Sequence, residues 1–191
     1  MTPRHRSSIA VPGLLAVALI AAGCQDSTPP TALKRPSFWG GENQCPETKF
    51  TGGGRIDPTP PNSMFGKVTF GFNIHGATNC VVSKGEIQVV HHPSQTKYHV
   101  SIHDGTDGFG NTPTFSVDGT CITVFATARV KHVNGDWHPH PIGMRACDNG
   151  EPGSSPGTGP DTFHWKVMDD DTFGHGDTGE TPLTGGNIQQ H

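Results

Sequence analysis

The stretch CITVFATARVKHVNGDWHPHPIGMRAC, residues 121–147, decides the fold. Its first half is apolar at every second position, at Ile122, Val124, Ala126, Ala128 and Val130. The alternation returns in its second half, at Ile142, Met144 and Ala146. A period of two predicts strands with one buried face, and the intervening Val133-Asn134-Gly135 is typical of a hairpin loop. The stretch therefore predicts an antiparallel hairpin.

The apolar faces of this hairpin also predict its register. If they are matched, Val124 lies opposite Met144, and Cys121 then lies directly opposite Cys147. Opposed cysteines on neighbouring strands are close enough for a disulfide. Two prolines in the return strand, Pro139 and Pro141, leave a bulge and a one-residue slip as the alternative.

A second hairpin is predicted over 85–91 and 98–103. Matched apolar faces pair Ile87 with Ile102 and Val89 with Val100. Its polar face then carries Glu86, Gln88, His99, Ser101 and His103. A hairpin with one apolar and one polar face is typical of an antiparallel sheet that is wetted on one side.

Composition favours many short strands. Gly and Pro contribute 26 and 17 of the 191 residues, and no long helix-favouring stretch occurs. Further strand candidates lie at 66–74, 112–117, 162–168 and 187–190. We therefore expect an all-β domain, an antiparallel β-sandwich or a partly open barrel of about eight or nine strands, stapled by two disulfides.

The N-terminus is interpreted as an export signal. Arg4 and Arg6 precede an apolar run over 9–22, which is shorter than the roughly 20 residues of a spanning helix. The run ends in Ala21-Ala22-Gly23-Cys24, which resembles the lipobox of bacterial lipoproteins although Ala21 stands where Leu is usual. The resemblance implies that residues 1–23 are removed and Cys24 is lipidated. Ordinary secretion after an A-x-A-like site is the alternative.

Lipidation of Cys24 would leave an even number of cysteines for the folded domain. With Cys121 and Cys147 paired, elimination leaves Cys45 with Cys80. The Pro-, Ser- and Thr-containing residues 24–47 are interpreted as a flexible tether and residues 48–191 as the β-domain. The lipid would then be the contact with the membrane, at the outer membrane or the cell surface.

A set of short motifs resembles the secreted bacterial β-domain of the post-COAP type. They are Thr51-Gly52-Gly53-Gly54, Phe70-Gly71-Phe72, residues 148–153 with Pro160-Asp161-Thr162-Phe163, and residues 183–189. The resemblance spans about residues 48–191 and rests on the order of the four pieces. It implies an all-β extracellular module and carries over no catalytic residues.

The acidic segment DDDTFGHGDTGE, residues 169–180, is the main metal candidate. Asp169, Asp171, Asp177 and Glu180 fall where a calcium loop places ligands, with a glycine at the turn. Phe173 stands where an oxygen ligand is expected, and neither flank reads as a helix. The segment therefore predicts a weak calcium site rather than an EF-hand, and a solvated acidic turn is the alternative.

Histidine is the second metal candidate, with 12 in the chain. His138 and His140 lie two residues apart, about 6.6 Å on a strand, which suits a bidentate pair for zinc, copper or nickel. The predicted register turns both toward the apolar side, which favours packing. Transition-metal binding is therefore the lesser alternative.

No catalytic or nucleotide-binding motif is found, and the formal charge of −4 with a pI near 6.3 argues against nucleic acid as a partner. The sequence is interpreted as a non-catalytic, lipid-anchored module of the bacterial cell envelope with an unidentified protein or glycan partner. The alternatives are binding of calcium, or less strongly zinc or copper, and binding of carbohydrate by analogy with other sandwiches.

Overall fold

The computed structural model describes residues 45–150, 159–169 and 176–191. These residues form an all-β fold of ten antiparallel strands without a helix, as the sequence predicts. The strands are β1 (Thr48–Ile56), β2 (Val68–Gly76), β3 (Val82–His91), β4 (Thr96–His103), β5 (Thr106–Asp107), β6 (Thr114–Asp118), β7 (Cys121–Lys131), β8 (Trp137–Cys147), β9 (Thr162–Val167) and β10 (Thr181–Gln190).

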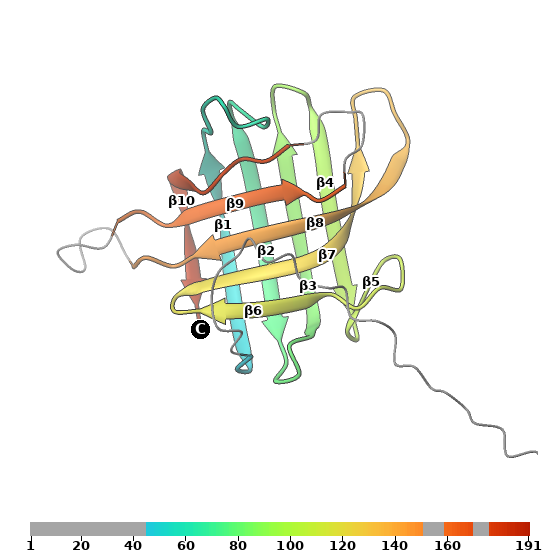
Figure 1. The fold of residues 1–191 in the computed structure, drawn as a ribbon, viewed down its shortest axis with the longest axis vertical. Helices are drawn as coiled ribbons and strands as arrows, with labels where there is room; N and C mark the ends of the chain where they lie inside the picture. The colour runs from blue at the N-terminus through green and yellow to red at the C-terminus, as the bar shows by residue number, and fades with distance from the viewer. Residues whose placement is uncertain (1–44, 151–158, 170–175) are drawn as a thin grey trace, which may run out of the picture. The chain divides into compact units, whose positions relative to one another are not determined.

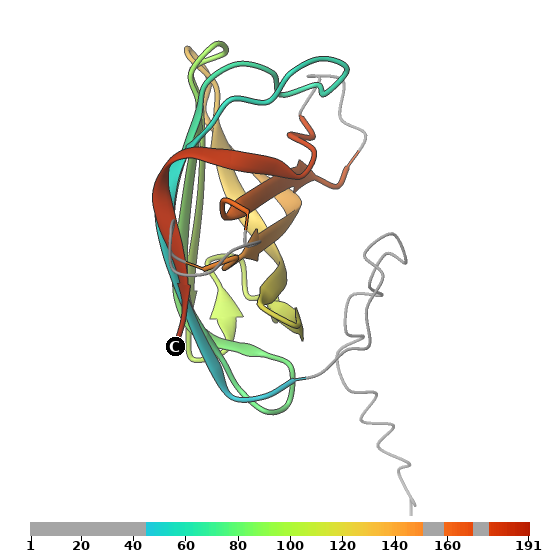
Figure 2. The same cartoon turned by 90° about the vertical axis from the view of Figure 1, so that its left-hand side faces the viewer.

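One hydrogen-bonded sheet folds into two layers (Figures 1 and 2). Its strand order is β5-β4-β3-β2-β1-β10-β9-β8-β7-β6, and an additional β4–β7 pairing closes the strands into a ring. The strands β1–β4 form one layer, and β6–β9 cross them at a steep angle in the other (Figure 1). Strand β10 begins beside β9 and ends beside β1, so it turns the corner between the layers.

The hairpin of β7 and β8 has the predicted register. Val124 pairs with Met144, and Cys121 pairs with Cys147. The pairing runs without a shift to Lys131 and Trp137, so neither Pro139 nor Pro141 introduces a bulge. Matching apolar faces was therefore sufficient to align these strands.

The predicted register of the hairpin of β3 and β4 is wrong by two residues. Ile87 pairs with Val100 instead of Ile102, and Val89 pairs with Tyr98. A shorter turn closes the hairpin at His91 and Thr96. Because side chains alternate with a period of two, a two-residue shift leaves every side chain on its predicted face. The polar and apolar faces of this hairpin are therefore as predicted.

Both predicted disulfides are present. Cys121 and Cys147 join β7 to β8 at the end of the hairpin, with Cα atoms 4.0 Å apart. Cys45 and Cys80 join the residues before β1 to the turn between β2 and β3, with Cα atoms 5.0 Å apart. The second bond holds the N-terminal end of the domain against the first layer.

Strand β1 was not expected, because Gly52-Gly53-Gly54 interrupts its alternation. The structure shows what these glycines do. Gly54 lies opposite Gly186 of β10, and a side chain on either residue would collide with the backbone of the other strand. Gly186 also has a φ of +107°, which favours glycine. The glycines therefore let β1 and β10 meet at the corner between the layers.

The core lies between the two layers. The rings of Phe70 on β2 and Phe163 on β9 stack with centroids 3.8 Å apart, and Tyr98 meets Trp165 edge to face. All four side chains are buried. Within the described ranges, no helix is long and apolar enough to cross a membrane.

Candidate functional site

The outward side of the β1–β4 layer is positively charged although the chain has a formal charge of −4. Exposed basic residues point outward from β1, β3, β4 and the adjoining end of β7: Lys49, Arg55, Lys84, Lys97, Arg129 and Lys131. Along the same strands the outward acidic side chain is Glu86. We call this surface the outer face. Its charge would attract an anionic partner.

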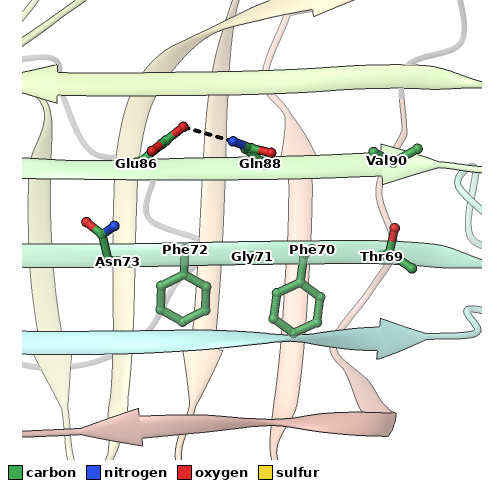
Figure 3. Close-up of a pocket in the computed structure, with 8 residues that line it drawn as sticks. All are labelled: Thr69, Phe70, Gly71, Phe72, Asn73, Glu86, Gln88 and Val90. Carbon is green, nitrogen blue, oxygen red and sulfur yellow. Dashed lines mark hydrogen bonds between the residues drawn. The ribbon is translucent and has the colours of Figure 1, made fainter.

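A hollow of about 490 Å³ lies in the middle of the outer face (Figure 3). Its floor is Gly71 of β2, where an added Cβ would have no neighbour within 4 Å. Gly53 of β1 pairs with Gly71, so two adjacent strands lack side chains at this point. The phenylalanines on either side of Gly71 belong to the core, which makes the floor firm.

Polar side chains surround this floor. Gln88 Nε2 donates to Glu86 Oε1 at 2.8 Å, as Figure 3 shows, and His99 Nε2 of β4 lies 3.0 Å from the same oxygen. These hydrogen bonds, from Gln88 first, lower the pKa of Glu86. Asn73 and Thr69 of β2 complete the rim. The hollow thus offers amide, hydroxyl and carboxylate groups to a polar ligand.

A second hollow, of about 580 Å³, continues the first along the strands. The two share Asn73 and Glu86, and the second extends to His75 and His103. Burial, followed by the charges of the neighbouring lysines, lowers the pKa of His75. We call the two adjoining hollows the trough.

A third hollow, of about 310 Å³, lies at the seam between β4 and β7. The hydrogen-bonded pairing of these strands ends at His99 and Arg129, and the strands separate beyond it. Asp107 Oδ2 accepts a hydrogen bond from the backbone amide of Thr127 at that point. The exposed rings of Phe109 and Trp137 line the opening, which we call the seam hollow.

The described residues of the predicted calcium site form hydrogen bonds with different partners. Asp169 Oδ2 lies 2.9 Å from His140 Nδ1, and Asp177 Oδ1 lies 2.6 Å from His164 Nε2. Thr162 donates to Glu180 at 2.9 Å. Asp171 lies outside the described residues. Among those described, no three His, Cys, Asp or Glu side chains are grouped to hold a metal, and the calcium site stays a prediction.

The two histidines proposed as a transition-metal pair differ in burial. His140 is buried and His138 is exposed, although both lie on one side of β8 opposite Ala128 and Val130. The partner of His140 is the carboxylate of Asp169. His140 is therefore packed into the domain, which is the alternative that the register favours. The transition-metal pair stays a prediction.

Sequence reasoning named several residues of the outer face but did not identify it as a site. Glu86, Gln88, His99 and His103 were assigned to the polar side of one hairpin. The trough also requires β1 and β2 beside that hairpin, and β1 was hidden by its glycines. The clustering of lysines from separate strands becomes visible only after the strand order is known.

Comparison with known proteins gives no match: no family model, no curated protein and no solved structure matches the chain. The resemblance to post-COAP domains therefore stays a prediction.

Proposed function

We propose that this protein is a non-catalytic, lipid-anchored module of the bacterial cell envelope that binds a polar ligand in the trough. The observation that carries the proposal is the floor at Gly71, within a rim of amide, hydroxyl and carboxylate groups. Its partner on β1, Gly53, also lacks a side chain. Strand interiors usually avoid glycine because it weakens them. A ligand that approaches the backbone closely would account for the pair on this open face.

The positive charges of the outer face would attract an anionic ligand toward the trough. The exposed lysines at its corners include Lys49 and Lys84, both at the second hollow. Electrostatic attraction of this kind raises association rates and weakens with salt. An envelope component with hydroxyl or acidic groups fits these properties.

The proposed location is supported by the cysteines. Both disulfides lie within the described domain, and such bonds persist in oxidising compartments outside the cytoplasm. Cys24 in its lipobox-like context would supply the anchor. We expect the cell-derived mature N-terminus to be a lipidated Cys24 in mass spectrometry, and an unmodified N-terminus at another residue would refute the anchor.

The trough can be tested with a substitution that fills it. An added Cβ at Gly71 meets no neighbour, and valine favours a strand, so Gly71→Val should cover the floor and keep the fold. We expect the exported Cys24→Ala protein, which lacks the lipid, to sediment with purified envelopes of its bacterium. Gly71→Val in this protein should abolish that sedimentation.

Gly185→Val is the matched control. Gly185 also lies on a strand with no neighbour within 4 Å of an added Cβ, but it does not line the trough. This variant should sediment as the Cys24→Ala protein does. If Gly71→Val and Gly185→Val behave alike while both keep the parental melting temperature, the trough is not the binding surface.

A further inference from the structure

The seam hollow combines features that the trough lacks. Phe109 and Trp137 are large hydrophobic residues with 42% and 41% of their surface exposed. They belong to separate segments, the loop after β5 and the start of β8, yet they line one opening. Exposed aromatic rings gathered around a hollow provide flat apolar surfaces for a ligand.

Basic side chains lie on the Trp137 ring. The guanidinium carbon of Arg129 is 5.3 Å from the ring centroid, and Lys131 Nζ is 5.9 Å from it. Lys97 of β4 pairs directly with Lys131 across the seam. The cation–π contacts hold the first two charges in place before a ligand arrives.

Within the described ranges, these charges have no acidic partners. In the part of the chain that the structure describes, no ion pair is formed by Lys97, Arg129 or Lys131. Some other cations of the domain are paired, such as Arg55 with Asp57 and Lys166 with Asp177. The three cations of the seam therefore remain available to an external anion.

The walls of the seam hollow supply groups that recognise hydroxyls. Ser101 and His99 of β4 face Thr127 of β7 across the opening. The side-chain amide of Asn111 donates to Thr127 Oγ1 at 2.9 Å, which orients that hydroxyl. The chemistry is thus a flat apolar wall, positive charge and hydroxyl-recognising groups within one opening.

We propose that the seam hollow binds a carboxylated sugar unit of an acidic glycan. The sugar's C–H face packs on the Phe109 ring, and its hydroxyls meet the polar wall. Its carboxylate accepts hydrogen bonds from Arg129 and Lys131, which the Trp137 ring holds in place. The seam hollow is separate from the trough, so this proposal goes beyond the proposed function and adds a second binding site on the same side of the domain.

The test is calorimetric titration of the exported Cys24→Ala protein with tetragalacturonate at about 50 mM salt. We expect at least tenfold tighter binding than to neutral galactotetraose, and a loss of affinity in high salt. Arg129→Gln, Lys131→Gln and Trp137→Ala should each weaken binding at least tenfold. All three side chains lie on exposed positions, so the melting temperatures should stay near that of the parent protein.

Lys67→Gln is the matched control, since it removes the same charge from another exposed position of the domain. Lys67 precedes β2 and lines neither the trough nor the seam hollow. The affinity of this variant for tetragalacturonate should change less than twofold. Equal losses in Lys67→Gln and Lys131→Gln would show attraction by general charge and overturn the proposal.

Three other outcomes also overturn it: equal affinity for galactotetraose, equal affinity for a tetrathymidylate of similar charge, and no binding of tetragalacturonate at millimolar concentration. The two proposals fail separately. If envelopes bind through the trough but tetragalacturonate does not bind, the proposed function stands and the acidic glycan falls. If the seam variants lose binding to tetragalacturonate while Gly71→Val keeps envelope binding, the acidic glycan stands and binding in the trough falls.

Discussion

The carboxylate of Asp161, just before β9, accepts a 2.6 Å hydrogen bond from the backbone amide of Ile188 on β10. Its other oxygen accepts the amide of Asn149 at 2.9 Å. Asp161 is buried, so water does not replace these bonds. One side chain thus ties the last strand of the chain to the end of β8.

Asp161→Asn should therefore destabilise the domain. The amide group can accept one of the two hydrogen bonds but turns an N–H₂ group toward the other donor. Loss of a buried bond to a charged group and an unsatisfied donor together predict about 2–4 kcal/mol. Asp148→Asn is the control, since Asp148 also accepts two backbone amides but is only half-buried. Urea unfolding that gives equal losses for the two variants would contradict this role of burial.

At the corner between β1 and β10, the adjacent residues Gly185 and Gly186 should differ strongly in the stability that is lost when each is replaced by alanine. An alanine at Gly186 would collide with the backbone of Gly53 and would have to keep a φ of +107°. The adjacent Gly185 has open space around an added Cβ. We expect Gly186→Ala to cost at least about 2 kcal/mol and Gly185→Ala less than about 0.5 kcal/mol.

Thermal or urea unfolding of these two variants measures the difference directly. Both remove the same conformational freedom from the unfolded chain, so the comparison cancels that contribution. A Gly186→Ala protein as stable as Gly185→Ala would mean that the two strands can separate at the corner without cost.

The sequence allowed the fold class, one register and the Cys121–Cys147 disulfide to be predicted because these depend on apolar alternation. The Cys45–Cys80 disulfide was then predicted by elimination. The alignment that pairs Val124 with Met144 also places Cys121 opposite Cys147, and a two-residue shift would lose that second match. The alignment of Ile87 could not be predicted in the same way, because a two-residue shift buries the same face. Turn length decided that register, and it left no apolar signal.

The candidate site was less accessible to sequence reasoning than the core. The trough depends on Gly53 and Gly71, which are adjacent only because β1 pairs with β2. The seam hollow depends on Arg129 meeting His99, a contact between two hairpins. A single sequence shows local periodicity, whereas these contacts follow from the order of strands in the sheet.

On the other layer, His164 predicts a dependence of stability on pH. Burial lowers the pKa of His164 below 6.5, although its hydrogen bond to Asp177 acts in the opposite direction. The folded state therefore binds fewer protons than the unfolded state near pH 6. By linkage, the free energy of unfolding is highest above pH 6.5 and falls as the pH drops from 6.5 through the folded pKa.

His164→Gln should remove this part of the pH dependence while keeping a donor to Asp177. The carboxylate titrates in a separate window: burial raises the pKa of Asp177, but hydrogen bonds from the Gly179 amide, His164 and Lys166 outweigh it and leave the pKa below 3.8. Urea unfolding between pH 7.5 and pH 5, with a chelator present, measures the slope. An identical slope in wild type and His164→Gln would contradict the assignment.

Calcium binding in the acidic segment would compete with hydrogen bonds that its carboxylates already form. To serve as ligands, Asp169 and Asp177 would have to share their oxygens between the ion and their histidine partners. Among the described residues, Asp169 Oδ1 is buried and has no hydrogen-bond partner, so this oxygen is available. These two observations favour a weak site of the kind found in extracellular modules, with a dissociation constant of about 10⁻⁴–10⁻³ M.

Thermal melts with calcium and with chelator test it. At ten-millimolar calcium, binding to the folded state alone would add about 1.4–2.7 kcal/mol, which raises the melting temperature by several degrees. Magnesium, which prefers stricter octahedral geometry, should give a smaller shift. Asp171→Asn should abolish the calcium shift without lowering the melting temperature in chelator. A calcium shift below one degree, unchanged in Asp171→Asn, would leave the segment as a solvated acidic turn whose described carboxylates serve the fold through His140 and His164.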